Sequence, residues 1–183
     1  MLCVLIGMPG SGKSTVGRQL ARRLGLPFLD TDQVLETRLG CSIREFFEAQ
    51  GESAFRDREE QTLAECLAQE RGVVSTGGGI VLRPGNRQRL QQAPCVIYLR
   101  ASPEDIYRRL RHDTSRPLLQ VADPLRKLKE LYADRDPLYR ESSRFVVETG
   151  RPTVAALVNM ISMQLDLALP DRLGARTGET PKL

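Results

Sequence analysis

Residues 2–15, which read LCVLIGMPGSGKST, decide the fold. The run within residues 1–6 is apolar without a break, which is typical of a strand buried on both faces of a sheet. From residue 14 to residue 24 an apolar side chain recurs at every fourth position, and Gly25 ends the pattern. A buried strand, a glycine-rich turn and an amphipathic helix together predict the first unit of an α/β fold.

The turn itself, residues 7–14, fits the pattern G-x-x-x-x-G-K-[ST] of the phosphate-binding P-loop. Its glycines let successive backbone N–H groups face phosphate oxygens, and the start of the helix adds a positive dipole end. Lys13 can reach the β- and γ-phosphates, and the Ser14 hydroxyl can ligate Mg²⁺. Because the flanking strand and helix are also present, we predict a nucleoside triphosphate site with Mg²⁺ rather than a simple glycine-rich turn.

The rest of the chain alternates strand and helix patterns. Strand-like runs follow at 27–30, 73–75, 95–99 and 145–148, and helical patterns at 33–39, 43–49, 52–70, 86–92, 103–110, 124 onward and 153–167. This alternation predicts a parallel sheet with helices on both faces, and such sheets bind ligands beyond the carboxyl ends of their strands. We expect one domain over residues 1–169 and a disordered polar tail over 170–183.

Composition narrows the classes of function. The net charge is +4, but acidic residues are mixed throughout, so the balance suits small anionic ligands as well as nucleic acid. Four cysteines without a C-x-x-C pair and a single histidine argue against a zinc site. No secretory signal pattern and no long apolar run is visible. We expect a reduced, cytoplasmic monomer with no nucleic-acid or membrane partner.

Two carboxylates close the second predicted strand. Asp30 is the best candidate to support the metal, and Glu148 after the last strand is a weaker one. Asp32 points the same way if the chain is still extended, so it could bind a substrate hydroxyl or accept its proton. The alternative is that Asp32 caps a helix beginning at Gln33.

Three consecutive glycines, Gly77, Gly78 and Gly79, follow the third predicted strand. They form either a loose turn or a place where backbone N–H groups approach a ligand closely, since glycine has no Cβ. Their position on the same edge of the sheet as the P-loop favours the close approach.

Several arginines are candidates to bind an acidic substrate. Arg56, Arg116 and Arg140 could each offer bidentate donors to a carboxylate or phosphate, although a single arginine is more often a solvated surface residue. Arg108, Arg109, Arg111 and Arg116 surround a polar loop, which fits a mobile lid that closes on phosphates. The alternative is a charged helical face followed by a loop.

Six segments together resemble the shikimate kinase family. They are the P-loop, Leu29-Asp30-Thr31-Asp32, Phe55-Arg56-x-x-Glu59, the three glycines, Arg116-Pro117-Leu118-Leu119 and Pro137-Leu138-Tyr139-Arg140, in order within residues 2–165. The P-loop is common to many kinases, but the combination is far more specific. The resemblance implies a three-layer α/β/α P-loop NTPase fold similar to nucleoside monophosphate kinases. It also implies a five-stranded parallel sheet, a substrate-binding segment at about 31–60 and a lid at about 110–123.

The implied activity is transfer of the γ-phosphoryl group of ATP to the 3-hydroxyl of shikimate, with Mg²⁺, in chorismate and aromatic amino-acid biosynthesis. The resemblance implies that the catalytic residues are Lys13, Asp32 and Arg116. Implied ATP-binding residues are Gly10, Ser11, Gly12, Lys13, Ser14, Thr15, Arg109, Arg116 and Arg151, and implied metal-binding residues are Ser14 and Asp30. Implied shikimate-binding residues are Asp32, Phe47, Phe55, Arg56, Glu59, Gly78, Gly79 and Arg140. Among these, Arg56 and Arg140 are expected to hold the carboxylate, and Glu59 to orient Arg56.

Two other readings compete. Another small-molecule P-loop kinase, such as a gluconate kinase or a nucleoside monophosphate kinase, shares the phosphate loop but not the joint set of other segments. A non-enzymatic nucleotide-dependent switch or RNA-binding module is encouraged by the net charge of +4, but the sequence offers no basic and aromatic RNA-binding platform.

Overall fold

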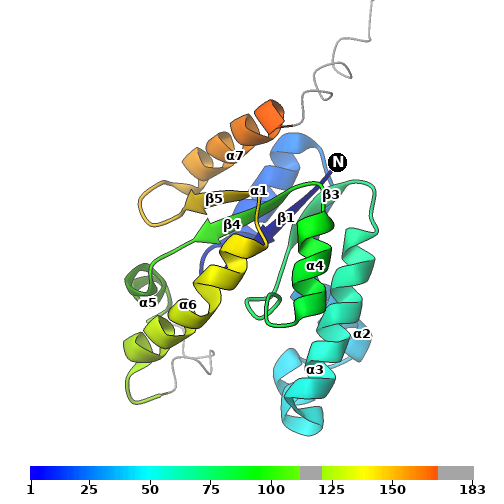
Figure 1. The fold of residues 1–183 in the computed structure, drawn as a ribbon, viewed down its shortest axis with the longest axis vertical. Coiled ribbons are helices and arrows are strands. Elements are labelled where there is room, and N and C mark those ends of the chain that lie inside the picture. Colours follow the sequence, from blue (N-terminus) through cyan, green and yellow to red (C-terminus); the bar gives the residue numbers. More distant parts are fainter. Residues whose placement is uncertain (112–120, 169–183) are drawn as a thin grey trace, which may run out of the picture.

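The structure is a computed structural model that describes residues 1–111 and 121–168. Within them, five parallel strands form one sheet in the order β2-β3-β1-β4-β5 (Figure 1). The strands are β1 (Leu2–Ile6), β2 (Phe28–Asp30), β3 (Gly72–Ser75), β4 (Val96–Arg100) and β5 (Phe145–Glu148). The helices are α1 (Lys13–Leu24), α2 (Thr31–Leu39), α3 (Ile43–Leu67), α4 (Pro84–Gln92), α5 (Pro103–Leu110), α6 (Pro124–Glu141) and α7 (Val154–Ala168).

Helices cover both faces of the sheet, which gives three layers. On one face, alternate residues of β1, β3 and β4 pack against α3, α4, α5 and α6. On the other face, the intervening residues pack against α1 and α7. Every residue of β1 is buried, because this central strand contacts apolar side chains on both sides. The predicted three-layer α/β/α fold with a five-stranded parallel sheet is confirmed.

Helix boundaries near the site differ from the sequence-based expectation in two places, at α2 and at α3. Helix α2 begins at Thr31 rather than near Gln33, because the Asp30 side chain caps it. The two helices expected at 43–49 and 52–70 are joined as α3, and the break between them reduces to non-helical geometry at Gly51 (φ 80°, ψ 173°). Helix α6 continues through Pro137 to Glu141, although a proline inside a helix removes one backbone hydrogen bond.

Part of the expected organisation lies outside the described residues. Most of the expected lid, including residues 112–120, and the expected tail at 170–183 belong to this part of the chain. Among the helices in residues 1–111 and 121–168, none is long and apolar enough to cross a membrane.

The start of the P-loop is fixed by contact with β4, which generates a prediction. A Cβ on Gly7 would lie 2.5 Å from the carbonyl oxygen of Leu99, a backbone atom that cannot rotate away. Gly7→Ala should therefore lower the free energy of unfolding by about 3 kcal/mol or more, measured by urea denaturation. The matched control is Gly40→Ala, at φ 68° with no atom within 4 Å of its Cβ, which should cost only about 1–2 kcal/mol. Equal losses in the two variants would contradict the collision.

Candidate active site

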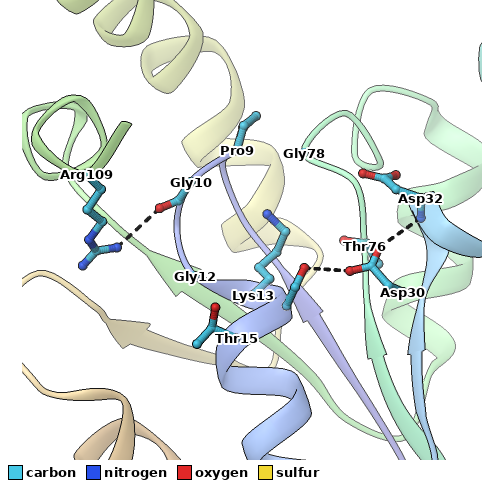
Figure 2. Close-up of a pocket in the computed structure, with 11 residues that line it drawn as sticks. Pro9, Gly10, Gly12, Lys13, Thr15, Asp30, Asp32, Thr76, Gly78 and Arg109 are labelled. Atoms are coloured by element: carbon cyan, nitrogen blue, oxygen red, sulfur yellow. Dashed lines mark hydrogen bonds between the residues drawn. The ribbon is translucent and has the colours of Figure 1, made fainter. Parts of the chain in front are cut away.

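A cavity of about 450 Å³ opens at the carboxyl ends of β1, β2 and β3 (Figure 2). It lies between the P-loop and the segment that begins α2, and Lys13 projects into it between Arg109 and Asp32. Its lining residues are Pro9, Gly10, Gly12, Lys13, Ser14, Thr15, Asp30, Asp32, Thr76, Gly78 and Arg109. The structure thus gathers much of the phosphate loop, Asp30 at the end of β2 and Asp32 at the start of α2 around one space.

The P-loop is folded around the side chain of Lys13. Lys13 Nζ donates hydrogen bonds of 2.9 Å to the carbonyl oxygens of Gly7 and Met8. Ser11 is buried, and its hydroxyl has no hydrogen-bond partner among the described residues. Helix α1 begins at Lys13, so its N-terminal N–H groups lie at the cavity wall that Gly12, Ser14 and Thr15 help to line. This arrangement suits an anion such as a triphosphate.

Three side-chain oxygens meet beside the loop. Ser14 Oγ donates to Asp30 Oδ2 at 2.6 Å and lies 3.3 Å from Ser75 Oγ. Ser75 ends β3 directly opposite Asp30 in the sheet, and the sequence reading missed it although a polar residue at a strand end was the available signal. Residues 1–111 and 121–168 hold no cluster of three or more His, Cys, Asp or Glu suited to a metal. Mg²⁺ needs no such cluster, since it commonly uses one or two carboxylates together with substrate phosphates.

Asp32 lies in the first turn of α2 and does not cap the helix. The cap is Asp30, whose Oδ1 accepts a hydrogen bond of 3.1 Å from the backbone N–H of Asp32. The carboxylate of Asp32 is therefore left for the cavity. Burial, together with the neighbouring charge of Asp30, raises the pKa of Asp32 to about 6, although Lys13 acts in the opposite direction. Such a group is ionised at neutral pH and still basic enough to accept a proton.

The three glycines make room for side chains of the site itself. A Cβ on Gly77 would lie 2.7 Å from Asp32 Oδ1, and one on Gly78 would lie 2.5 Å from Pro9 Cδ. A Cβ on Gly79 would overlap the guanidinium of Arg56. None of the three has a positive φ, so the requirement is one of space rather than of backbone conformation. Within the structure, the atoms closest to the three glycines belong to Asp32, Pro9 and Arg56, and the expected approach of a ligand to the backbone stays a prediction.

Arg56 is held in place from two sides. Its Nη1 donates to Glu59 Oε2 at 2.7 Å, and its guanidinium lies 5.0 Å from the centre of the Phe55 ring. Burial raises the pKa of Glu59, while the positive charge of Arg56 opposes the rise. The Phe47 ring, at the surface, lies 5.6 Å from Phe55 across the break at Gly51. These residues form one wall beside the glycines.

A second arginine at the glycines is Arg135, not Arg140. Arg135 Nη1 donates to the carbonyl oxygen of Gly78 at 3.2 Å, and its charge acts on Glu59. Arg140 instead donates from Nε to Asp136 Oδ2 at 2.7 Å and is largely exposed. Arg140 is thus paired with Asp136, while Arg135 is the arginine of α6 that contacts Gly78, so the geometry favours Arg135 over the expected Arg140 for a ligand beside the glycines. Tyr139, also on α6, donates its hydroxyl to the same Gly78 oxygen.

Of the three remaining arginines predicted for the site, one lines the cavity, one is exposed away from it and one lies outside the described residues. Arg109 lies across the P-loop, with Nη1 3.4 Å from the Ser11 carbonyl oxygen and Nη2 bonded to that of Thr149. Arg151 is exposed in the loop between β5 and α7 and does not line the cavity formed by the described residues. Arg116 lies outside the described residues.

Comparison with known proteins agrees with this geometry. A family model described as shikimate kinase matches residues 9–166. The shikimate kinase of Paracidovorax citrulli is 59% identical over 90% of this chain and 91% of its own length. That of Ralstonia nicotianae is 56% identical over 89% of this chain and 86% of its own length.

Solved structures show the same fold. The shikimate kinase of Acinetobacter baumannii, in complex with shikimate, superposes with a TM-score of 0.85 at 41% identity and covers 94% of each chain. A gluconokinase of Sinorhizobium meliloti has a TM-score of 0.59 at 19% identity over 96% of each chain, which shows a shared fold alone.

The raised pKa of Asp32 predicts a stabilising substitution. Because the folded pKa of about 6 exceeds the ordinary 3.8, the folded state binds the proton more tightly, and stability falls as the pH rises through this range. Asp32→Asn should therefore raise the free energy of unfolding at about pH 8 by up to about 3 kcal/mol, with little change below about pH 4. The measurement is urea denaturation at both pH values, with the exposed Asp134→Asn as control. A destabilised Asp32→Asn at the higher pH would contradict the burial of this charge.

Proposed function

This chain belongs to the shikimate kinase family, and on that premise we propose how its residues divide the work. The enzyme transfers the γ-phosphoryl group of ATP to the 3-hydroxyl of shikimate, a step of the shikimate pathway. The observation that supports the assignment of roles is the convergence of the P-loop, Asp32 and two arginines around Gly77, Gly78 and Gly79.

The P-loop residues Gly10, Ser11, Gly12, Ser14 and Thr15 bind the phosphates of ATP, mainly through backbone N–H groups at the start of α1. Lys13 exchanges its hydrogen bonds to the Gly7 and Met8 carbonyl oxygens for the β- and γ-phosphates. Its position in the cavity needs only a local change of partner. Arg109 of α5 and Arg151, in the loop between β5 and α7, contact the adenine end of the nucleotide.

The three oxygens beside the P-loop fit Mg²⁺. The Ser14 hydroxyl and the Asp30 carboxylate would hold the ion, and the Ser75 hydroxyl, 3.3 Å from Ser14 Oγ, would help to position Ser14. When bound, the ion neutralises charge on the phosphates. These oxygens are hard ligands, which suits Mg²⁺ rather than a softer metal.

Arg56 and Arg135 bind the carboxylate of shikimate. Both lie against the glycines, and Arg56 is already oriented by Glu59 and by the Phe55 ring. Phe47 and Phe55 form an apolar wall for the ring of the substrate, and the backbone of Gly78 and Gly79 contacts its polar groups. Arginine is suited to this role because its planar donors match the two oxygens of a carboxylate.

Asp32 binds the hydroxyl groups of shikimate and accepts the proton of the 3-hydroxyl as that oxygen attacks the γ-phosphorus. Its pKa of about 6 leaves it ionised at neutral pH. Phosphoryl transfer then depends mostly on positioning and on neutralising the charge of the transferred group. Lys13 supplies part of that neutralisation, and Arg116 in the lid supplies a further part.

Residues 1–169 act as one domain, with the segment 31–60 contributing Asp32, Phe47, Phe55, Arg56 and Glu59 and the segment 110–123 acting as the lid. We propose that the enzyme works as a monomer. Its four cysteines all lie among the described residues and form no disulfide there, which suits the reducing cytoplasm. We propose no nucleic-acid partner.

The choice of acceptor tests the proposal directly. ADP release should depend on shikimate, and gluconate, AMP and CMP at equal concentration should give less than about 1% of that rate. Gluconate has a carboxylate but an open chain in place of the ring, and AMP and CMP have no carboxylate. A coupled assay of ADP release measures each acceptor, with Lys13→Ala as the inactive control. Turnover of gluconate or a nucleotide without turnover of shikimate would overturn the proposed function.

The proposal of Arg135, rather than Arg140, as the second arginine that binds the carboxylate gives a second test. Arg135→Ala should raise the KM for shikimate by about 30-fold, because a charged hydrogen bond is worth about 2 kcal/mol, and should leave the KM for ATP nearly unchanged. Arg140→Ala should change the KM for shikimate by no more than about threefold, as expected for an exposed arginine. Steady-state kinetics in both substrates measures this. The reverse order of effects would restore the assignment to Arg140.

A further inference from the structure

A polar cluster beside the active site is not used by the chemistry described so far. Asp136 is at its centre, on the turn of α6 next to Arg135. Asp136 Oδ1 accepts hydrogen bonds from the Tyr98 hydroxyl at 2.9 Å and from Arg100 Nε at 3.3 Å. The Asp136 side chain is only 15% exposed. Since Tyr98 and Arg100 both belong to β4, the cluster ties α6 to the sheet.

The cluster is also linked to the glycine loop of the active site. The Tyr98 ring stacks on Tyr139 with centroids 4.9 Å apart, and the Tyr139 hydroxyl donates to the Gly78 carbonyl oxygen, which also accepts from Arg135. Asp136 and Tyr139 are therefore linked to one tyrosine of β4, and Arg135 and Tyr139 to one carbonyl of the glycine loop. The rotation of this turn of α6 decides where the Arg135 guanidinium lies.

Helix α6 lacks one backbone hydrogen bond at this turn. Pro137 follows Asp136 directly and has no N–H to bond to the carbonyl of Ala133. A helix interior that contains proline bends unless other contacts hold it. The hydrogen bonds that Asp136 accepts from Tyr98 and Arg100 lie at the turn where the backbone hydrogen bond is missing. They therefore hold the helix where it could otherwise bend.

The cluster differs from an exposed ion pair because its central carboxylate is mostly buried and has several hydrogen-bond partners. Burial disfavours the charge of Asp136, yet hydrogen bonds from Arg140, Tyr98 and Tyr132 hold its pKa below the ordinary value. Arg100 is partly buried and is also paired with Glu148 at 2.7 Å, so the network extends to β5. Networks of this kind are stronger and more rigid than isolated surface pairs.

We propose that Asp136 is a positioning residue for the substrate: held by Tyr98 and Arg100, it fixes the turn of α6 that presents Arg135 to the carboxylate of shikimate. The inference rests on the proposed role of Arg135. In this role Asp136 acts through Arg135 rather than by a contact of its own with the substrate, so its effect is confined to the group that Arg135 binds.

The experiment compares Asp136→Ala, Arg135→Ala and the double variant with the wild type, in full-length enzyme. Asp136→Ala should raise the KM for shikimate by about tenfold and change the KM for ATP by less than about twofold. Tyr98→Phe, which removes one hydroxyl and keeps the ring, should shift the same KM by about threefold and serves if Asp136→Ala does not fold. The matched control is Glu130→Ala, which removes an exposed carboxylate from an i,i+4 pair with Arg126 on the same helix and should have no effect.

Two readouts separate positioning from general destabilisation. If Asp136 acts through Arg135, the double variant should have the same KM as Arg135→Ala alone; additive effects would overturn the proposal. With the methyl ester of shikimate, which lacks the carboxylate charge, the effect of Asp136→Ala should largely disappear; an undiminished effect would also overturn it.

Failure of the two proposals can be told apart. If Arg135→Ala raises the KM for shikimate and both Asp136→Ala and Tyr98→Phe do not, the positioning role is wrong and the carboxylate assignment stands. If Arg135→Ala leaves that KM unchanged, the proposed function of Arg135 is wrong, and the positioning role that rests on it is overturned as well.

Discussion

The parallel pairing of β2, β3 and β1 is the constraint on which the site depends. Asp30 lies opposite Ser75, and Ser75 lies opposite Leu5, so these strands end at nearly the same level. The segments that follow them, which carry the P-loop, Asp32 and the three glycines, therefore open on one edge of the sheet. A change of register in one strand would move its carboxyl end along the sheet and separate the Ser14 hydroxyl from the Asp30 carboxylate.

At this edge, the absence of side chains at three positions allows dense packing. The space at Gly77, Gly78 and Gly79 is filled by Asp32, Pro9 and Arg56, while the Gly78 carbonyl oxygen accepts from Arg135 and Tyr139. One short stretch of backbone thus sets the spacing between the carboxylate that is proposed to act on the hydroxyl and the arginines that are proposed to hold the acid. Such fixed spacing is what catalysis by positioning requires.

The same packing has an electrostatic cost. Asp30, Asp32 and Glu59 lie close together, and burial raises the pKa of both Asp32 and Glu59. Lys13 and Arg56 offset part of this repulsion within the protein. The carboxylate arrangement is therefore one that the fold tolerates rather than one that stabilises it, which is common where function needs a charged group in a shielded place.

The sequence by itself determined the α/β architecture, the P-loop and the strand-end position of Asp30, because these follow from local patterns of apolar residues and glycine. It also indicated the break in α3 near Gly51, and it carried the motifs that resemble the shikimate kinase family. It left open whether Asp32 caps a helix or faces a substrate, and it named Arg140 rather than Arg135 as a carboxylate ligand. Both arginines belong to α6, and five residues at about 100° each turn them to different faces of the helix. Only the packing of α6 against β4 decides which face meets the glycines, because that contact joins residues distant in the chain.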